Sequence, residues 1–201
     1  MPRNSRKSIN SSYLHVMIQG ISHENIFSNA LQKQVYLKYM CDAINLNEVR
    51  ILVYAMMDNH AHFLMYHKNN YKEISRMMNV VNSKYAKFYN KNNDRVGYVF
   101  RDRFKSKEIS NHKHLYNTIA YIHNNPKKAG IVENLEDYAF SSYRKFVTNQ
   151  KSSKDIQLLF GTQNYKKIFN YIHKNYSEND ILKDDGEENY NNVISEFLTK
   201  N

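Results

Sequence analysis

The segment from residue 49 to 66 constrains the fold of this chain more than any other. Residues 49–56 are mostly β-branched or apolar, a three-residue link follows, and a second strand-like run begins at His60. Two such runs joined by a short link predict a β-hairpin. Alternate side chains of a strand share a face, so His60 and His62 would project together while Ala61 faces the core. The hairpin therefore presents two imidazoles on one side of a sheet.

The other hydrophobic patterns predict an α+β fold around this hairpin. We expect Ser28 to cap the first helix and Pro126 to end the last one at or near Asn125. The order predicts an antiparallel sheet of about four to five strands with helices on one face, ferredoxin-like or RRM-like. The expected elements are a strand over 13–19, helices over 30–44 and 71–89, an irregular loop followed by a short basic strand over 100–109, and a helix from Ser110 or His112 to about Asn124.

Charge divides the chain into two parts. Residues 1–150 carry 22 Lys and Arg against 11 Asp and Glu, a net charge of +11, whereas residues 151–201 carry 7 against 8, a net charge of −1. The total of 201 residues suits one domain with an appendage. We therefore expect the functional domain over residues 1–150 and a helical C-terminal extension over 151–201, with helix-like stretches at 156–176 and 188–198.

Several protein classes are disfavoured by composition. The sequence has no apolar stretch of about 18 residues and no secretory leader, so we expect a cytoplasmic protein without membrane partners. The single cysteine, Cys41, excludes a disulfide within the chain and a Cys-rich zinc motif, and we expect it to be a small core residue. A metal would therefore need His, Asn, Gln or carboxylate ligands.

Residues 84–128 combine positive charge with aromatic side chains. They hold 11 basic and 3 acidic residues. Basic groups that follow phosphates, mixed with aromatic rings on which bases stack, are typical of single-stranded nucleic acid binding. An A/T-rich genome could also enrich Lys, Asn and Tyr, but it does not explain the charge difference between the two parts of the chain. The interleaved aromatic residues are Tyr85, Phe88, Tyr89, Tyr98, Phe100, Phe104, Tyr116 and Tyr121, and the candidate phosphate contacts are Arg101, Arg103, Lys105 and Lys107.

The last helix of the domain offers a partner for the two histidines. Tyr121 and Asn125 are four residues apart, so they would share one helix face. An amide oxygen can be the third ligand of a hard divalent cation beside two imidazoles, and the phenol would then lie near whatever the metal polarises. A phosphodiester is the natural candidate, given the basic aromatic surface.

Five stretches of the sequence resemble the single-tyrosine transposases of the HUH superfamily and follow one another in the family's order. The name HUH denotes His, hydrophobic residue, His. The resemblance is greatest to the REP-associated tyrosine transposases and covers about residues 10–147. Two features have no counterpart in the family: Asp58, where relatives often have Pro, adds a carboxylate near the expected metal, and the part after residue 150 matches nothing. The stretches are Tyr13–Gly20 with Ile26 and Phe27, Tyr54–Leu64, Gly97–Ser106, Tyr121–Val132 and Tyr138–Arg144.

The resemblance implies a function for the histidine pair. It implies that His60 and His62 bind Mg²⁺ or Mn²⁺, that Asn125 is a further ligand, and that Tyr121 is the nucleophile. Residues 1–150 would then be the catalytic domain. The expected reaction is cleavage of hairpin-containing or repeat-end single-stranded DNA through a 5′-phosphotyrosine intermediate, followed by strand rejoining in DNA transposition and recombination.

Two other functions remain open on the sequence alone. One is a single-stranded nucleic-acid-binding protein that derives from such a transposase without catalysis. The other is a metal-dependent nuclease in which water replaces tyrosine. The sequence does not decide between a monomer and a homodimer.

Overall fold

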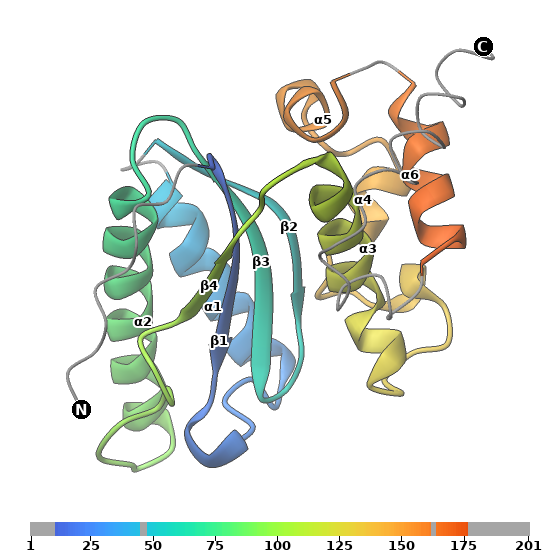
Figure 1. The fold of residues 1–201 in the computed structure, drawn as a ribbon. Coiled ribbons are helices and arrows are strands. Elements are labelled where there is room, and N and C mark those ends of the chain that lie inside the picture. Colours follow the sequence, from blue (N-terminus) through green and yellow to red (C-terminus); the bar gives the residue numbers. More distant parts are fainter. Residues whose placement is uncertain (1–10, 45–47, 162–163, 177–201) are drawn as a thin grey trace.

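A computed structural model describes residues 11–44, 48–161 and 164–176 of the chain. Its centre is one antiparallel sheet with the strand order β2-β3-β1-β4 (Figure 1). The α+β class, the hairpin and the short basic strand are confirmed. The strands are β1 (Tyr13–Gln19), β2 (Val49–Met56), β3 (His60–His67) and β4 (Lys105–Glu108).

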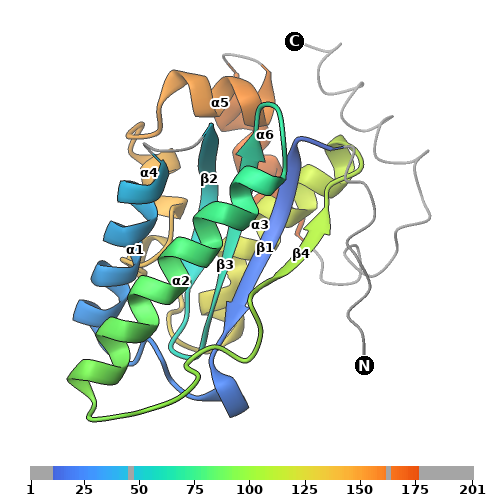
Figure 2. The same ribbon diagram turned by 90° about the vertical axis from the view of Figure 1, so that its left-hand side faces the viewer.

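Two long helices, α1 (Ala30–Ile44) and α2 (Lys72–Asn92), cover one face of the sheet (Figure 2). The sequence explains this packing, because alternate residues of β1 meet a helical stripe of apolar residues on α2. Ala61 joins this core, as predicted. The buried residues of β1 are Leu14, Val16 and Ile18, and those of the α2 stripe are Ile74, Met77, Met78, Val81 and Tyr85.

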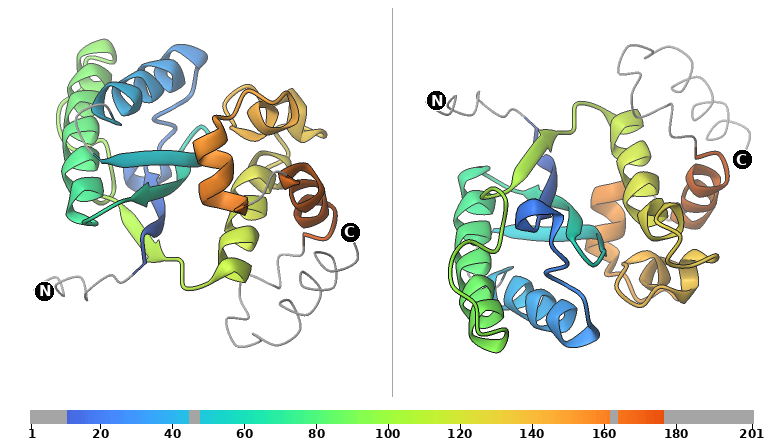
Figure 3. Two further views of the ribbon diagram at one scale, coloured as in Figure 1. Left: turned by 90° about the horizontal axis from the view of Figure 1, so that it is seen from above. Right: turned by 90° about the horizontal axis from the view of Figure 1, so that it is seen from below.

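Helix α3 (His112–Lys128) lies on the opposite face, against β2 and β3. The sheet is therefore enclosed between two helical layers over these strands (Figure 3), an arrangement that the order of elements did not predict. A bulge in β2 contributes to the packing against α3, since the side chains of Leu52 and the neighbouring Val53 both lie on the α3 side of the sheet. The smaller elements on this side are η2 (Leu135–Asp137), α4 (Tyr143–Val147), α5 (Ser153–Phe160) and α6 (Tyr165–Lys174), while η1 (Ile21–His23) follows β1.

Two predicted helix limits are wrong. Asn29, rather than Ser28, caps α1, because its Oδ1 accepts from the backbone nitrogen of Gln32 at 2.9 Å. Helix α3 also continues past Pro126 to Lys128. Pro126 stands in the last turn, where its missing N–H removes a single hydrogen bond, and its own carbonyl accepts from the backbone nitrogen of Ile131.

The C-terminal region differs from the expectation in its helices. The stretch expected at 156–176 is two helices, because Gly161 adopts a left-handed conformation with φ of 61° and ends α5. The stretch expected at 188–198 lies outside the described residues.

Two other expectations can be compared with the structure. Cys41, which was expected to be a small core residue, is exposed. None of the described helices has the length and apolar composition needed to cross a membrane.

A chain of hydrogen bonds joins α6 to α3. His173 donates from Nδ1 to the carbonyl oxygen of Phe169 at 2.7 Å, so its Nε2 is an acceptor for Nδ1 of His123 at 2.9 Å. The other nitrogen of His123 then accepts from Oγ of Ser142, also at 2.9 Å. Ser142 precedes α4, so this chain connects three helices behind the face of α3 that meets the sheet.

Candidate active site

Strand β3 places His60 and His62 on the face of the sheet that meets α3. Their ring centroids are 5.1 Å apart and the rings are perpendicular. His60 is half-buried, whereas His62 is only 3% exposed. The predicted shared orientation of the two imidazoles is therefore confirmed.

The surroundings of both imidazoles favour their neutral form. Burial lowers the pKa of His60, with a smaller contribution from nearby His23. Burial lowers the pKa of His62 well below its usual value, and His15 and His60 add to the effect. Because a histidine binds a metal through an unprotonated nitrogen, these surroundings favour ligand chemistry at neutral pH.

A hydrogen bond fixes which nitrogen of His60 is available. Nδ1 of His60 lies 2.5 Å from Oδ1 of Asn59, and an amide oxygen can only accept, so Nδ1 carries the proton. Nε2 of His60 is then left with its lone pair. This arrangement, in which the second ring nitrogen donates to an oxygen, is typical of metal-binding histidines.

A third histidine, which the sequence pattern did not indicate, lies at the site. His15 in β1 has its Nε2 atom 2.9 Å from Nδ1 of His62. Burial lowers the pKa of His15 to about 4, and the neighbouring His114 and Lys107 contribute further. The strand pattern puts His15 on one face of β1, but finding its partner requires the sheet order, which the sequence does not state.

Helix α3 brings Tyr121 over His62 and His15. The ring centroid of Tyr121 lies 5.3 Å from that of His62 and 5.7 Å from that of His15, both in edge-on arrangements. The Tyr121 side chain is half-buried. Two residues that are far apart in the sequence, one on a strand and one on a helix, are thus brought into contact.

Asn125 lies one turn further along α3. Its Nδ2 donates to the backbone carbonyl of Tyr121 at 2.7 Å, which leaves Oδ1 as the atom that could bind a cation. Within the described residues, no hydrogen bond joins Asn125 to either histidine, and no three His, Cys, Asp or Glu side chains are arranged to hold a metal. A cation beside His60 and His62 would therefore need oxygen ligands from an amide or a substrate.

The extra carboxylate of Asp58 is engaged elsewhere. Its Oδ1 accepts from Nζ of Lys33 at 2.6 Å, and the Lys33 side chain is almost fully buried on α1. Asp58 therefore links the hairpin turn to the helices of the other face, and its proximity to the expected metal is not supported.

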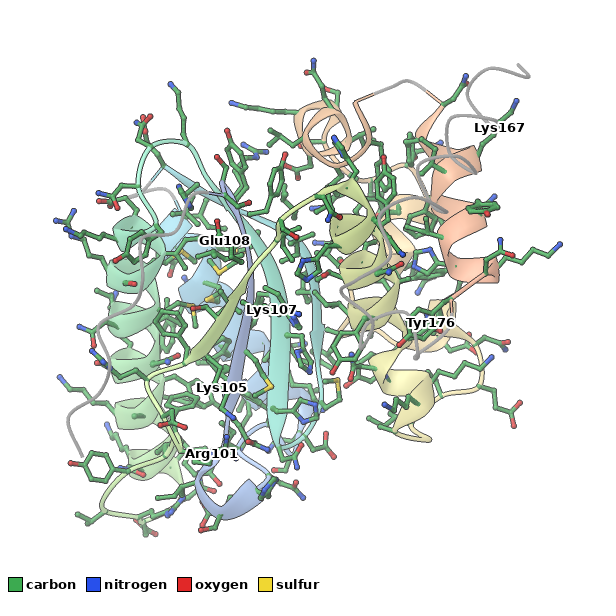
Figure 4. The ribbon with its side chains drawn as sticks, viewed as in Figure 1. Arg101, Lys105, Lys107, Glu108, Lys167 and Tyr176 are labelled. Carbon is green, nitrogen blue, oxygen red and sulfur yellow. The ribbon has the colours of Figure 1, made fainter. Side chains whose placement is uncertain are left out.

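The four candidate DNA-binding residues fall into two positions. Lys105 and Lys107 of β4 pair with Met17 and His15 of β1, so their side chains share the face that carries the histidines. Figure 4 shows Arg101, Lys105 and Lys107 following one another along β4 and the loop before it. Arg103 lies toward α2, where its carbonyl accepts from Asn82.

The sequence profile of the IS200-like transposases matches residues 8–125 of the chain, which is more than half of it. The chain belongs to this family. The matched region contains all three site histidines and Tyr121, and it ends at Asn125. The expected membership among the single-tyrosine transposases is confirmed.

A solved structure supports the same fold. A REP-associated tyrosine transposase bound to a REP hairpin is similar with a TM-score of 0.59 and 17% sequence identity, over 77% of this chain and 90% of that chain. A protein from Deinococcus radiodurans that was assigned as a transposase has a TM-score of 0.41 and 9% identity, over 76% of this chain and 100% of that chain. A comparison with curated proteins finds no match.

Proposed function

We propose that this transposase-family chain cleaves single-stranded DNA with Tyr121 as the nucleophile. The observation that carries the proposal is the position of Tyr121, whose ring lies 5.3 Å from the buried ring of His62. A phenol beside neutral imidazoles, next to a basic strand, suits attack on a phosphodiester. That a protein of similar fold is bound to a REP hairpin supports hairpin-containing DNA as the substrate.

The reaction conserves the phosphodiester bond energy. The phenol oxygen of Tyr121 attacks the phosphorus, the bond from phosphorus to the 3′ oxygen breaks, and the products are a 5′-phosphotyrosine and a free 3′-hydroxyl. The proton lost by the phenol is balanced by the proton that the 3′ oxygen gains. Rejoining is the reverse attack by a 3′-hydroxyl, so no nucleotide cofactor is consumed.

The proposed metal ligands are His60, His62 and Asn125. Two neutral imidazoles and one amide oxygen would hold Mg²⁺ or Mn²⁺ weakly enough to leave positions for phosphate oxygens. When bound, the cation supplies neutralisation of the charge on the scissile phosphate. The chain itself would orient the two imidazoles through Asn59 and His15 and hold the phenol in place through α3.

The test is covalent capture of DNA by the full chain. Hairpin-containing single-stranded DNA is incubated with the protein and Mn²⁺, and denaturing gels are examined for a protein–DNA adduct. We expect the wild-type protein to form the adduct and Tyr121→Phe to form none. Tyr116→Phe is the matched control, because Tyr116 lies on the same helix but stacks on Phe160 in the core.

A second pair of variants tests the histidines. His60→Ala should abolish the adduct, whereas His112→Ala, which changes an exposed histidine at the start of α3, should not. An adduct from Tyr121→Phe at the wild-type rate would refute the nucleophile. DNA binding without any adduct would favour the non-catalytic binder, and cleavage without an adduct would favour water as the nucleophile.

A further inference from the structure

A groove with a volume of about 910 Å³ lies between α2 and residues 97–104. This volume is at the upper end of the range for ligand sites. Arg76, Asn79 and Ser83 are spaced so that they share one side of α2, and all three are exposed. The polar and aromatic residues along the two walls include Arg76, Asn79 and Ser83 on the helix and Tyr98, Arg101 and Arg103 on the loop.

Hydrogen bonds hold the loop wall in place. Nδ2 of Asn82 on α2 donates to the carbonyl oxygen of Arg103 at 2.7 Å, while Oδ1 of Asn82 accepts from the hydroxyl of the buried Tyr36 at 2.8 Å. Nδ2 of Asn90 donates to the carbonyl oxygen of Gly97 at 2.9 Å. The groove is therefore bounded at both ends by contacts between α2 and the loop, so it exists before any ligand enters.

Tyr98 presents its ring to solvent beside this groove. It is 84% exposed, and of the eight aromatic residues that alternate with basic residues in 84–128 it is the exposed one, since Tyr85 and Tyr116 are buried and the other five are half-buried. Gly97, with φ of +106°, forms the turn that holds Tyr98 outward. An exposed ring that does not serve the core is available for stacking on a base.

Positive charge predominates around the groove. Its three arginines face a single lining carboxylate, that of Asp102. Arg76 pairs with Glu73 at 2.5 Å, and Arg101 lies 3.4 Å from Asp102. Arg103 forms no ion pair with any of the described residues. Phosphate groups would complement this charge.

The groove extends toward the part of the sheet that carries the candidate active site. Arg101, Asp102 and Phe104 also line a small hollow next to Gln19 and Lys105. The backbone nitrogen of Arg101 donates to the carbonyl oxygen of Gln19 at 2.9 Å, and Gln19 stands opposite His60 in the sheet. A strand that leaves the histidines along β4 would thus reach the groove at Arg101.

We propose that this groove binds the unpaired nucleotides that flank the cleaved phosphate, with a base stacked on Tyr98 and phosphates at Arg101 and Arg103. The inference rests on the proposed function, from which it takes single-stranded DNA as the substrate. Unpaired nucleotides are favoured over a duplex because the Tyr98 ring can stack only on a base whose face is not already covered by a neighbouring base, as it is inside a duplex.

The test measures binding of the full chain to two DNA probes by fluorescence anisotropy in EDTA, so that no cleavage occurs. One probe is a blunt hairpin, and the other is the same hairpin with a single-stranded flank, placed on the 5′ or the 3′ side. We expect the wild-type protein to bind a flanked probe more tightly than the blunt one. In Tyr98→Ala this advantage should fall about 5-fold or more, the loss expected for one stacked base.

Matched variants separate stacking from general damage. Tyr98→Phe should keep the advantage because it keeps the ring, and Val96→Ala should keep it because Val96 is 96% exposed but does not line the groove. Arg103→Ala should reduce the salt dependence of flanked-probe binding by about one phosphate contact. Since Tyr98 is mostly exposed, its variants should melt at the wild-type temperature.

Two results would overturn the inference. One is a Tyr98→Ala protein that keeps the full advantage for flanked probes on either side. The other is a Tyr98→Ala protein that loses as much affinity for the blunt hairpin as for the flanked probes, which would mean that the groove holds duplex DNA. Failure of the proposed function looks different, since the flank-dependent effect of Tyr98→Ala would persist while the wild-type protein formed no covalent adduct.

Discussion

Nε2 of His15 lies 2.9 Å from Nδ1 of His62, and this contact joins two strands across 47 positions of sequence. One of the two nitrogens must carry the proton that they share. When Nδ1 of His62 donates, its Nε2 keeps a lone pair on the side of the ring away from His15. His15 then has a positioning role, because it selects which nitrogen of His62 can bind a cation.

Replacement of His15 should weaken metal binding without removing a ligand. We expect His15→Ala to lower the affinity for Mn²⁺ by about 10- to 100-fold, as for other partners of metal-binding histidines. Calorimetric titration of Mn²⁺ into the DNA-free protein measures this. His15→Gln, which can still accept a hydrogen bond, should recover part of the affinity. Equal affinities in the wild-type and alanine proteins would contradict the positioning role.

Two adjacent asparagines on α3 provide a controlled test of the third ligand. Nδ2 of Asn125 donates to the carbonyl of Tyr121 at 2.7 Å, and Nδ2 of Asn124 donates to that of Ala120 at 2.8 Å. The two amides thus have the same local bonding but point from different sides of the helix. Asn125→Ala should lower both Mn²⁺ affinity and adduct formation at least 10-fold, whereas Asn124→Ala should change neither. Similar losses in both variants would indicate a helix effect instead of ligation.

The lysines of β4 should contribute to DNA binding through charge. We expect Lys105→Ala to lower the slope of log affinity against log salt concentration by about one contact. The control is Lys38→Ala, because Lys38 is an exposed lysine of α1 that pairs with Asp42 on the other face of the sheet. Binding of single-stranded DNA at a series of salt concentrations gives both slopes. An unchanged slope in Lys105→Ala would exclude a phosphate contact there.

Acid should destabilise the protein through the hydrogen-bonded pair of His123 and His173. Burial lowers the pKa of His173 to about 4, against the opposing hydrogen bond to Phe169, and burial lowers the pKa of His123 well below its usual value. An unfolded histidine has a pKa of about 6.5, so the unfolded chain binds more protons than the folded one between about pH 6.5 and 4. Stability should therefore be full above pH 6.5 and fall as the pH falls.

The contribution of His173 can be measured by urea unfolding at pH 7 and pH 5. The wild-type protein should lose on the order of 1–2 kcal/mol through this residue over that interval. In His173→Gln the amide oxygen can still accept from His123, but the group no longer titrates, so the loss between the two pH values should be smaller. Equal losses would mean that His173 does not sense the pH.

Local patterns predicted the parts of the site that lie within one element. The alternation in β3 placed His60 with His62, and the helical spacing in α3 placed Tyr121 near Asn125. The periodicity also predicted the hairpin, because the flanking runs are strongly apolar. These features depend on neighbours along the chain, which the sequence states directly.

Relations across elements could not be predicted in the same way. The pairing of His15 with His62 depends on β1 lying beside β3. The carboxylate of Asp58 binds Lys33 because the tertiary fold brings this residue of α1 next to the hairpin turn. Tyr85 and Tyr116, counted among the aromatic residues typical of a DNA-binding surface, are buried in the two cores, Tyr116 by stacking on Phe160. In each case tertiary packing decided the partner of a side chain whose own element was correctly predicted.

Strand β4 is at the edge of the sheet and, among the described residues, pairs on one side alone. An edge strand with an open side is a template for pairing with a second molecule, and natural proteins prevent this with short edges and lysines. β4 is four residues long, and its two lysines are exposed. The charges proposed to attract DNA would therefore also repel another copy of the protein, so the same strand would serve both substrate binding and resistance to aggregation.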